Sequence, residues 1–230
     1  MDVSIVPILE DNYAYVIQSG DMVGVVDPSE ADSVITYLEQ HNLNLDWIIN
    51  THHHWDHVDG NDELIQKYGC KVAAPDECKG DKDVILKDGE AFRFGDIEFQ
   101  IFLTSGHTMG HIVLYDPIYR ILFAGDTLFT MGCGRLFEGT PADMFKSMQI
   151  IKSLPPETAI YCGHEYTGDN AKFATHIMPD NQDIRIRATE VIGQQCTMPT
   201  LQAVEMTTNP YLIVDTVEEF TKIRQAKDNF

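Results

Sequence analysis

The stretch THHHWDH at residues 51–57 decides the fold and the site, because it places four histidines and an aspartate within six residues. It follows the apolar run 47–49, which predicts a short buried strand ending where the histidines begin. His52 and His54 are two residues apart, so in an extended chain their side chains leave on the same side and can hold one ion. Asp56 and His57 follow where the chain must turn, and they can face a second ion. Imidazoles and carboxylates are ligands of zinc, iron and manganese, so the stretch predicts a metal site rather than a histidine-rich surface loop.

The size and charge of the chain exclude several classes of protein. Its 230 residues are enough for one large core, or for one core and a small appendage. The formal charge of -20 exceeds the magnitude of about 2–8 that is usual for a small domain. Such a surface repels nucleic acid and anionic membranes, so we expect neither as a partner. No segment approaches the roughly 18–20 apolar residues of a membrane span, and residues 1–5 do not resemble a secretory signal. The expected compartment is the cytoplasm.

The cysteines predict free thiols. They are five, an odd number, and they lack the spacing of a zinc finger. None lies beside an obvious base in the sequence, so buried thiols in a reducing compartment are a better interpretation than a catalytic nucleophile. The five are Cys70, Cys78, Cys133, Cys162 and Cys196.

Apolar periodicity predicts an α/β chain that becomes helical toward its C-terminus. Strands are expected at 3–7, 13–18, 22–26, 47–50, 71–74, 92–94, 97–103, 112–115, 118–124 and 158–162. Helices are expected at 31–41, 61–68, 142–154, 169–177, 182–195 and 217–227. The sequence Asp27-Pro28-Ser29 is expected to supply the N-cap of the first helix. After Tyr166 few strand patterns remain, so we expect a domain boundary near residue 165.

Four polar residues, one of them in the stretch 51–57, come directly after apolar strands, beside small or turn residues. Active-site groups on loops at strand ends, held by a rigid sheet, are the usual arrangement of a metal enzyme. The residues are His52, His107, Asp126 and His164.

Motifs along nearly the whole chain together resemble those of one family. They are THHHWDH at 51–57, GHTMGH at 106–111, GDTLF at 125–129, GCGRLFEGT at 132–140, GHEYT at 163–167, TNPYL at 208–212 and RQAKDNF at 224–230. The first resembles the signature of the metallo-β-lactamase fold superfamily, and the combination is similar to the hydroxyacylglutathione hydrolase (glyoxalase II) family within it. The resemblance implies an αβ/βα sandwich with a small C-terminal helical domain. Residues 1–165 would form the catalytic domain, and residues 166–230 the helical domain that binds glutathione.

The resemblance also implies which residues hold two divalent ions. The first ion would be held by His52, His54 and His107, and the second by Asp56, His57 and His164. Asp126 would bridge both ions. Zinc is the first expectation, with iron and manganese as alternatives, because His and Asp accept all three. His53 and His111 belong to the motifs but are expected to support the ligands or to pack beside them.

The implied activity is hydrolysis of S-2-hydroxyacylglutathione thioesters, with S-lactoylglutathione giving lactate and glutathione in the last step of methylglyoxal detoxification. Two metal ions lower the pKa of a shared water, so a hydroxide can attack the thioester carbonyl near neutral pH. Asp56 is expected to orient that nucleophile or to take up its proton, which makes it the catalytic residue. The leaving thiolate has a moderate pKa, so no strong general acid is needed.

The family contacts the glutathione moiety with residues whose matching positions here are Arg135, Tyr166, Phe173, Arg224 and Lys227. The last two lie three residues apart on an expected helix, so they share a face and can bind one carboxylate. Family members carry lysine and tyrosine where this chain has Arg135 and Phe137. The first change keeps the charge with another geometry, and the second removes a hydroxyl, so a different thiol carrier stays open.

Two alternatives to this interpretation remain. A persulfide dioxygenase of the same fold uses one iron, and Asp56 and His164, as ligands of a second ion, argue against it. His54 stands where related flavodiiron proteins carry glutamate, which favours hydrolysis over oxygen reduction. A non-catalytic metal-binding module is disfavoured, because a bridging carboxylate suits an open site. Members of the family are often monomers, which we also expect here.

Overall fold

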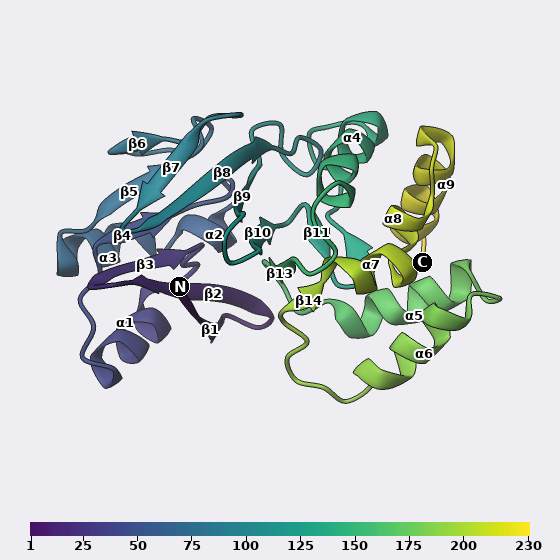
Figure 1. Ribbon diagram of the computed structural model, residues 1–230, viewed down its shortest axis with the longest axis horizontal. Coiled ribbons are helices and arrows are strands. Elements are labelled where there is room, and N and C mark those ends of the chain that lie inside the picture. Colours follow the sequence, from purple (N-terminus) through teal and green to yellow (C-terminus); the bar gives the residue numbers. More distant parts are fainter. The chain divides into compact units, whose positions relative to one another are not determined.

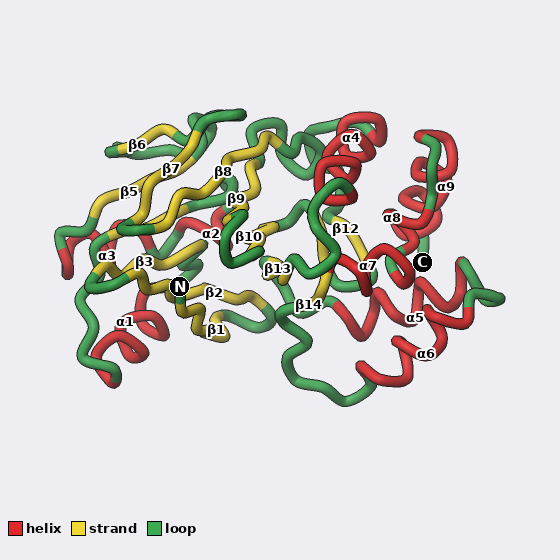
Figure 2. The backbone as a smooth tube through the Cα atoms, in the orientation of Figure 1, coloured by secondary structure: helices red, strands yellow, loops and turns green.

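The computed structural model describes all of residues 1–230, and the chain forms two compact units. The first unit comprises Met1–Leu103 and Gly110–Tyr119, and the second comprises Thr104–Met109 and Arg120–Phe230. Figures 1 and 2 show strands dominating the N-terminal half of the sequence and helices the C-terminal quarter. The prediction of an α/β chain that becomes helical toward its C-terminus is therefore confirmed.

A six-stranded sheet is the frame of the first unit, in the order β1-β2-β3-β4-β5-β6. Strands β1 to β3 pair antiparallel, whereas β3 to β6 pair parallel. Val26 of β3 lies opposite Ile49 of β4, so both strands deliver the residues that follow them to the same end of the sheet. Their bounds are β1 Asp2–Ile8, β2 Asn12–Ser19, β3 Met22–Val26, β4 Trp47–Ile49, β5 Lys71–Ala74 and β6 Val84–Ile85.

Helices α1 (Ala31–Gln40) and α3 (Asn61–Tyr68) belong to one apolar core with this sheet. The first buries Val34 and Leu38 at helical spacing, as predicted. The second ends at Gly69, whose φ of 64° is the left-handed conformation that glycine adopts readily. The short helix α2 (Trp55–Val58) was not predicted, and it forms the turn after the histidines.

A second group of strands in the first unit is an antiparallel meander of β7 (Ala91–Phe94), β8 (Ile97–Leu103) and β9 (Ile112–Asp116). It packs on the first sheet through the edge-on contact of Phe92 with Trp47, whose ring centroids are 5.3 Å apart. A Cβ at Gly24 would lie 2.9 Å from the Phe94 ring, so that glycine permits the close approach of the two layers.

The strand expected at 118–124 starts later, at Ile121. The Asp116 carboxylate accepts hydrogen bonds from the backbone N–H groups of Ile118 and Tyr119, at 2.8 and 3.1 Å. Such a side-chain bond competes with strand pairing and holds residues 116–119 as a turn. Ile118 is 75% exposed at the turn, so its β-branched side chain was a misleading strand signal.

The second unit contains three paired strands, a small hairpin and six helices. The strand order is β14-β13-β10, with β10 and β13 parallel and β13 and β14 antiparallel. The strands are β10 Ile121–Gly125, β13 Ala159–Cys162 and β14 Thr200–Leu201, and the hairpin joins β11 Leu128–Phe129 to β12 Gly132–Cys133. The helices are α4 Pro141–Lys152, α5 Thr167–Ile177, α6 Gln182–Val191, α7 Gln202–Thr208, α8 Pro210–Ile213 and α9 Val217–Asp228.

Four of the six helices of the second unit, α4, α6, α8 and α9, follow a residue whose side chain caps the helix. Thr140 and Asp143 form a capping box at the start of α4. Helix α6 ends at Val191 rather than at 195, because the backbone leaves the helical conformation at Ile192 and Gly193 has a φ of 76°. Helices α7 and α8 were missed, since the threonines around Asn209 are poor helix formers. No helix of the chain has the length and apolar character required to span a membrane.

Candidate metal centre and substrate site

The histidine stretch begins where β4 ends and continues into α2. One potential ligand atom of His52 lies within 4.8 Å of one of His54, and the same holds for Asp56 and His57. The two pairs predicted from spacing are therefore present as pairs in the first unit. His52 and His57 are almost fully buried, whereas His54 and Asp56 are partly exposed.

Asp27 is a site residue that the sequence reasoning missed. It follows β3 at the same sheet end as the histidines, and its Oδ2 lies 3.0 Å from Nδ1 of His57. The same carboxylate accepts hydrogen bonds from the Thr51 backbone N–H and hydroxyl, at 2.8 and 2.7 Å. A carboxylate on Nδ1 fixes the tautomer of a histidine and leaves Nε2 for a metal. The signal in the sequence is an aspartate at a strand end, which is also typical of a helix cap.

That cap prediction was wrong. The N-cap of α1 is Glu30, and its side chain makes no capping hydrogen bond. Asp27 and Ser29 instead face the histidine stretch, where the Ser29 hydroxyl donates to the backbone carbonyl of Asp56. Asn12 donates to the same carbonyl at 2.9 Å and lies 3.4 Å from the Asp56 carboxylate, so two polar side chains hold this residue.

His52 is oriented by its sequence neighbour. Its Nδ1 lies 3.0 Å from the hydroxyl of Thr51, which itself donates to Asp27. Because that hydroxyl has one proton, it accepts from His52 Nδ1–H, and Nε2 of His52 is left as the ligand atom. The ring of His111 stacks on His52 with centroids 4.7 Å apart, and Nδ1 of His53 lies 3.2 Å from Glu77.

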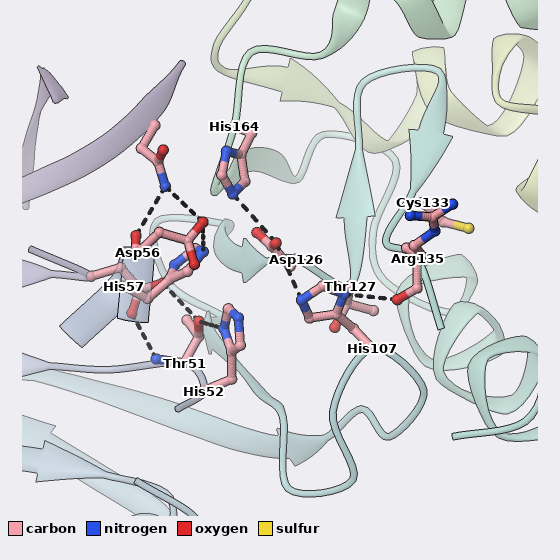
Figure 3. A network of polar contacts seen from close by, with 12 residues as sticks. Thr51, His52, Asp56, His57, His107, Asp126, Thr127, Cys133, Arg135 and His164 are labelled. Carbon is pink, nitrogen blue, oxygen red and sulfur yellow. Dashed lines mark hydrogen bonds and ion pairs between the residues drawn. The ribbon is translucent and has the colours of Figure 1, made fainter. Parts of the chain in front are cut away.

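Asp126 is the centre of the second unit's polar cluster, as Figure 3 shows. Its Oδ2 lies 3.3 Å from Nε2 of His107 and 3.4 Å from Nε2 of His164. Strands β10 and β13 run parallel with Gly125 opposite Cys162, which brings Asp126 and His164 to the same end. All three side chains are buried. One carboxylate oxygen therefore faces two imidazole nitrogens.

His107 is fixed by a backbone carbonyl. Its Nδ1 lies 2.8 Å from the carbonyl oxygen of Arg135, so Nδ1 carries the proton and Nε2 faces Asp126. Gly134 fits between these groups, since a Cβ there would lie 1.9 Å from the Asp126 carbonyl oxygen. Aromatic rings accompany both histidines: Phe137 meets His107 edge-on at 5.3 Å, and Tyr166 stacks on His164 at 4.6 Å.

The five residues predicted to bind substrate all belong to the second unit, and they differ in exposure. Arg135 and Tyr166 are exposed, at 61% for the Arg135 side chain and 38% for Tyr166, and Lys227 is partly exposed. Phe173 is buried, and its ring lies 5.1 Å below the Lys227 ammonium. Lys227 also donates to the Asp169 carbonyl at 3.3 Å. Burial, and then the charge of Arg224, lower the pKa of Lys227.

Arg224 is 6% exposed, and its guanidinium is engaged within the protein. Nη1 donates to the Cys133 carbonyl at 3.1 Å, and Nη2 donates to the Asp228 carboxylate at 2.8 Å. Asp228 also lies 3.8 Å from Nε of Arg135. Arg224, one of the two cationic residues predicted to bind a substrate carboxylate, is therefore already paired with a carboxylate of the protein.

All five cysteines are free, as predicted, and four of them are buried. Burial raises the pKa of the Cys78 thiol to about 12, and those of Cys70 and Cys133 to about 11. Thiols with such pKa values are poor nucleophiles near neutral pH, in agreement with the buried-thiol interpretation.

Comparison with known proteins supports the fold class and the family. Residues 8–78 and 79–164 match the family model described as Metallo-beta-lactamase superfamily, and residues 165–230 match Hydroxyacylglutathione hydrolase C-terminus. The chain is 42% identical over 243 aligned positions to the hydroxyacylglutathione hydrolase of Pelagibacter ubique, with 100% of each chain covered.

Solved structures agree on the fold. ETHE1 from Myxococcus xanthus superposes with a TM-score of 0.77 at 24% identity, covering 98% of this chain and 90% of its own. TTHA1623, whose crystal structure is a di-iron-bound form, has a TM-score of 0.68 at 24% identity, with 92% and 100% covered.

These matches define an αβ/βα protein of the metallo-β-lactamase superfamily with an additional C-terminal region, which confirms the predicted fold class. Its donor set of imidazoles and carboxylates is that of a divalent-metal protein. Within this superfamily, the chain belongs to the hydroxyacylglutathione hydrolase family.

Proposed function

We propose that this chain hydrolyses S-2-hydroxyacylglutathione thioesters, releasing glutathione and a hydroxy acid such as lactate. Full-length relationship to a hydroxyacylglutathione hydrolase supports the reaction class. The observation that carries the chemistry is the Asp126 carboxylate, with one oxygen within 3.4 Å of two imidazole nitrogens. Metallohydrolases that use a pair of ions share a carboxylate in this way.

The proposed ligand sets are those that the family resemblance implies. His52, His54 and His107 would hold one divalent ion, and Asp56, His57 and His164 the other, with Asp126 shared. The donor chemistry fits, because His52, His57 and His107 each bond through Nδ1 to a fixed acceptor, which leaves Nε2 for coordination. Zinc is proposed as the metal, with iron or manganese as alternatives, since these donors accept all three.

Bound divalent ions supply a water of lowered pKa and Lewis acidity toward the thioester carbonyl. The protein residues do the rest. Asn12 and Ser29 hold the Asp56 backbone, so its carboxylate can orient a water and take up its proton. The leaving group is a thiolate with a pKa of about 8.5, which departs without a protein general acid.

We propose that Arg135, Tyr166 and Lys227 contact the glutathione moiety directly. Their side chains are at least partly exposed on the second unit, and two of them are cationic in a chain of formal charge -20. Phe173 and Arg224 are buried, so their proposed contribution is to support this surface from below. The exposed ring of Phe137, beside His107, gives one wall of the site no hydrogen-bonding group.

Several broader assignments accompany the activity. We propose a catalytic domain at residues 1–165 and a glutathione-binding domain at residues 166–230. The two family models meet at residues 164 and 165, and helices dominate the second range. A cytoplasmic location is supported by the five free thiols. A monomer without nucleic-acid partners remains our proposal from charge and family.

The test is a parallel assay on purified, metal-analysed protein. Thioester loss is followed with S-lactoylglutathione, and oxygen uptake is followed with glutathione persulfide, after reloading the metal-free chain with zinc, iron or manganese. We expect metal-dependent thioester hydrolysis and no oxygen uptake. Oxygen uptake with an inert thioester would replace the hydrolase by a persulfide dioxygenase.

A further inference from the structure

The hairpin of β11 and β12 is held by side chains from helices that follow it far along the sequence. Backbone polar atoms of five consecutive residues, 129 to 133, are each bound by a side chain. Asn170 of α5 donates to the Thr130 carbonyl at 3.2 Å, and Glu205 of α7 accepts from the Met131 N–H at 2.8 Å. Asn209 at the start of α8 donates to the carbonyls of Phe129 and Gly132, at 3.1 and 2.9 Å. Arg224 of α9 donates to the Cys133 carbonyl at 3.1 Å.

We call these four side chains, Asn170, Glu205, Asn209 and Arg224, the hairpin clamp. All are buried, with exposed fractions of 6, 0, 0 and 6%. Buried polar side chains are normally hydrogen-bonded. The clamp also has a hydrogen bond within it, since the Asn209 amide donates to the Glu205 carboxylate at 2.9 Å. Glu205 further accepts from the Thr200 hydroxyl at 2.7 Å.

The clamp holds a strained turn. Met131 has a φ of 57°, a left-handed conformation that a non-glycine residue adopts at a cost. Such a conformation persists where surrounding contacts over-determine it. Here the Met131 N–H is bonded to Glu205, and the carbonyls on either side of the residue are bonded to Asn170 and Asn209.

The two ends of the hairpin lead directly to proposed metal ligands. Asp126 and Thr127 precede it, and the Gly134 N–H after it donates to the Thr127 carbonyl at 3.3 Å. Gly134 leaves no space for a Cβ beside the Asp126 carbonyl. The next residue, Arg135, supplies the carbonyl that fixes Nδ1 of His107. A shift of the hairpin therefore moves the carbonyl that accepts from His107 Nδ1–H.

We propose that the hairpin clamp consists of positioning residues for the metal centre, with Asn209 as its central member. The clamp fixes residues 129–133, these fix the Arg135 carbonyl, and that carbonyl presents Nε2 of His107 to the ion. The affinity for divalent metal thus depends on helices α5 and α7 to α9, which contribute no ligand. The inference rests on the proposed metal binding, and it assigns the buried Arg224 to positioning of the metal centre rather than to support of the substrate surface.

The decisive variant is Asn209→Ser. Serine preserves the N-cap acceptor of α8 but removes the amide that bonds Phe129, Gly132 and Glu205. Asn181→Ser is the matched control, because Asn181 caps α6 in the same way, with its side chain accepting from Ile184 N–H. Zinc affinity is measured on metal-free protein by competition with a chromophoric chelator, and KM and kcat are measured at saturating zinc.

We expect Asn209→Ser to weaken zinc binding about 10- to 100-fold, the usual effect of losing a group that orients a ligand. KM for the thioester should stay unchanged, and Asn181→Ser should bind zinc like the parent. A folded Asn209→Ser protein with parental zinc affinity would overturn the inference. A parent chain that binds no divalent ion would instead remove the proposed function, so the two failures are distinguishable.

Arg224→Lys decides the question if Asn209→Ser does not fold. Lysine keeps the positive charge but not the two separate donors that reach Cys133 and Asp228. Weakened zinc affinity with unchanged KM supports the clamp. A raised KM with parental zinc affinity would return Arg224 to the substrate site and refute its positioning role.

Discussion

The two units hold their proposed ligands in different ways. In the first unit, His52, His54, Asp56 and His57 lie in one short segment that runs from the end of β4 into α2. Their orienting partners are side chains, above all Asp27. In the second unit, His107, Asp126 and His164 come from three distant segments, and the partner of His107 is a backbone carbonyl. A carboxylate can be removed by one substitution, whereas a carbonyl can only be displaced by loosening the segment that carries it. This difference is the reason why we propose that helices without ligands control the position of His107.

The largest effect is expected at Asp126, the residue that both proposed ions would share. Asp126→Ala removes the carboxylate shared by the two proposed ions, so turnover should fall by about 10³-fold, equivalent to about 4 kcal/mol in the barrier. Bound metal, measured by elemental analysis, should fall with it. Asp116→Ala is the control, since Asp116 is another buried aspartate at a strand end and bonds only to a turn. Retained activity and metal in the Asp126 variant would exclude it as a ligand.

A smaller effect is expected from the orienting carboxylate of the first unit. Asp27→Asn replaces the charged acceptor of His57 Nδ1–H, so the affinity for divalent metal should fall about 10- to 100-fold. Chelator competition measures the change. Asp46→Asn serves as control, because Asp46 accepts a backbone hydrogen bond from Val23 away from the histidine stretch. Equal zinc affinities of the two variants would mean that the first unit does not orient its histidines through Asp27.

A still smaller effect should separate substrate binding from metal binding in the second unit. Lys227→Ala removes a cation from the proposed glutathione surface, so KM should rise about 10-fold, as expected for a hydrogen bond to a charged group. The value of kcat and the zinc affinity should not change. Lys222→Ala, on an exposed part of the same helix α9, should leave KM as it is. An unchanged KM for the Lys227 variant would remove the tail helix from the substrate site.

The smallest effect tests whether instability alone disturbs the second unit's ligands. Thr140→Ala removes the N-cap of α4, which should cost about 1 kcal/mol of stability and lower Tm by about 2–4 °C. Because α4 contributes no side chain to the hairpin clamp, zinc affinity should be that of the parent. Calorimetry and chelator competition on the same sample measure both. Weaker zinc binding here would mean that general loosening, not the clamp, controls His107.

Much of the fold could be predicted because its signals are local. Apolar alternation placed β3 and β5 at their observed bounds, and helical spacing with a following glycine placed α3. The failures have local causes that periodicity does not contain. Ile118 lies in a turn closed by Asp116, and α8 begins because Asn209 caps it.

The proposed ligands were all named from sequence, since spacing and motifs are properties of the chain itself. Their orienting partners were not. The sequence predicts Asp27 as part of a helix cap, whereas the parallel pairing of β3 and β4 brings it beside His57. The sequence places Arg224 beside Lys227 on one helix face. Only the structure shows that Arg224 is buried and bonded to the Cys133 carbonyl.

The sequence by itself thus determined the fold class, the family and the donor chemistry. Only the tertiary structure decided which groups orient the imidazoles and that Asp126 faces both His107 and His164. It also decided that side chains from four helices bond the backbone of one hairpin. The physical reason is that periodicity and motif spacing act over a few residues along the chain. Hydrogen bonds between segments dozens of positions apart have no period, and they exist only after packing has brought those segments together.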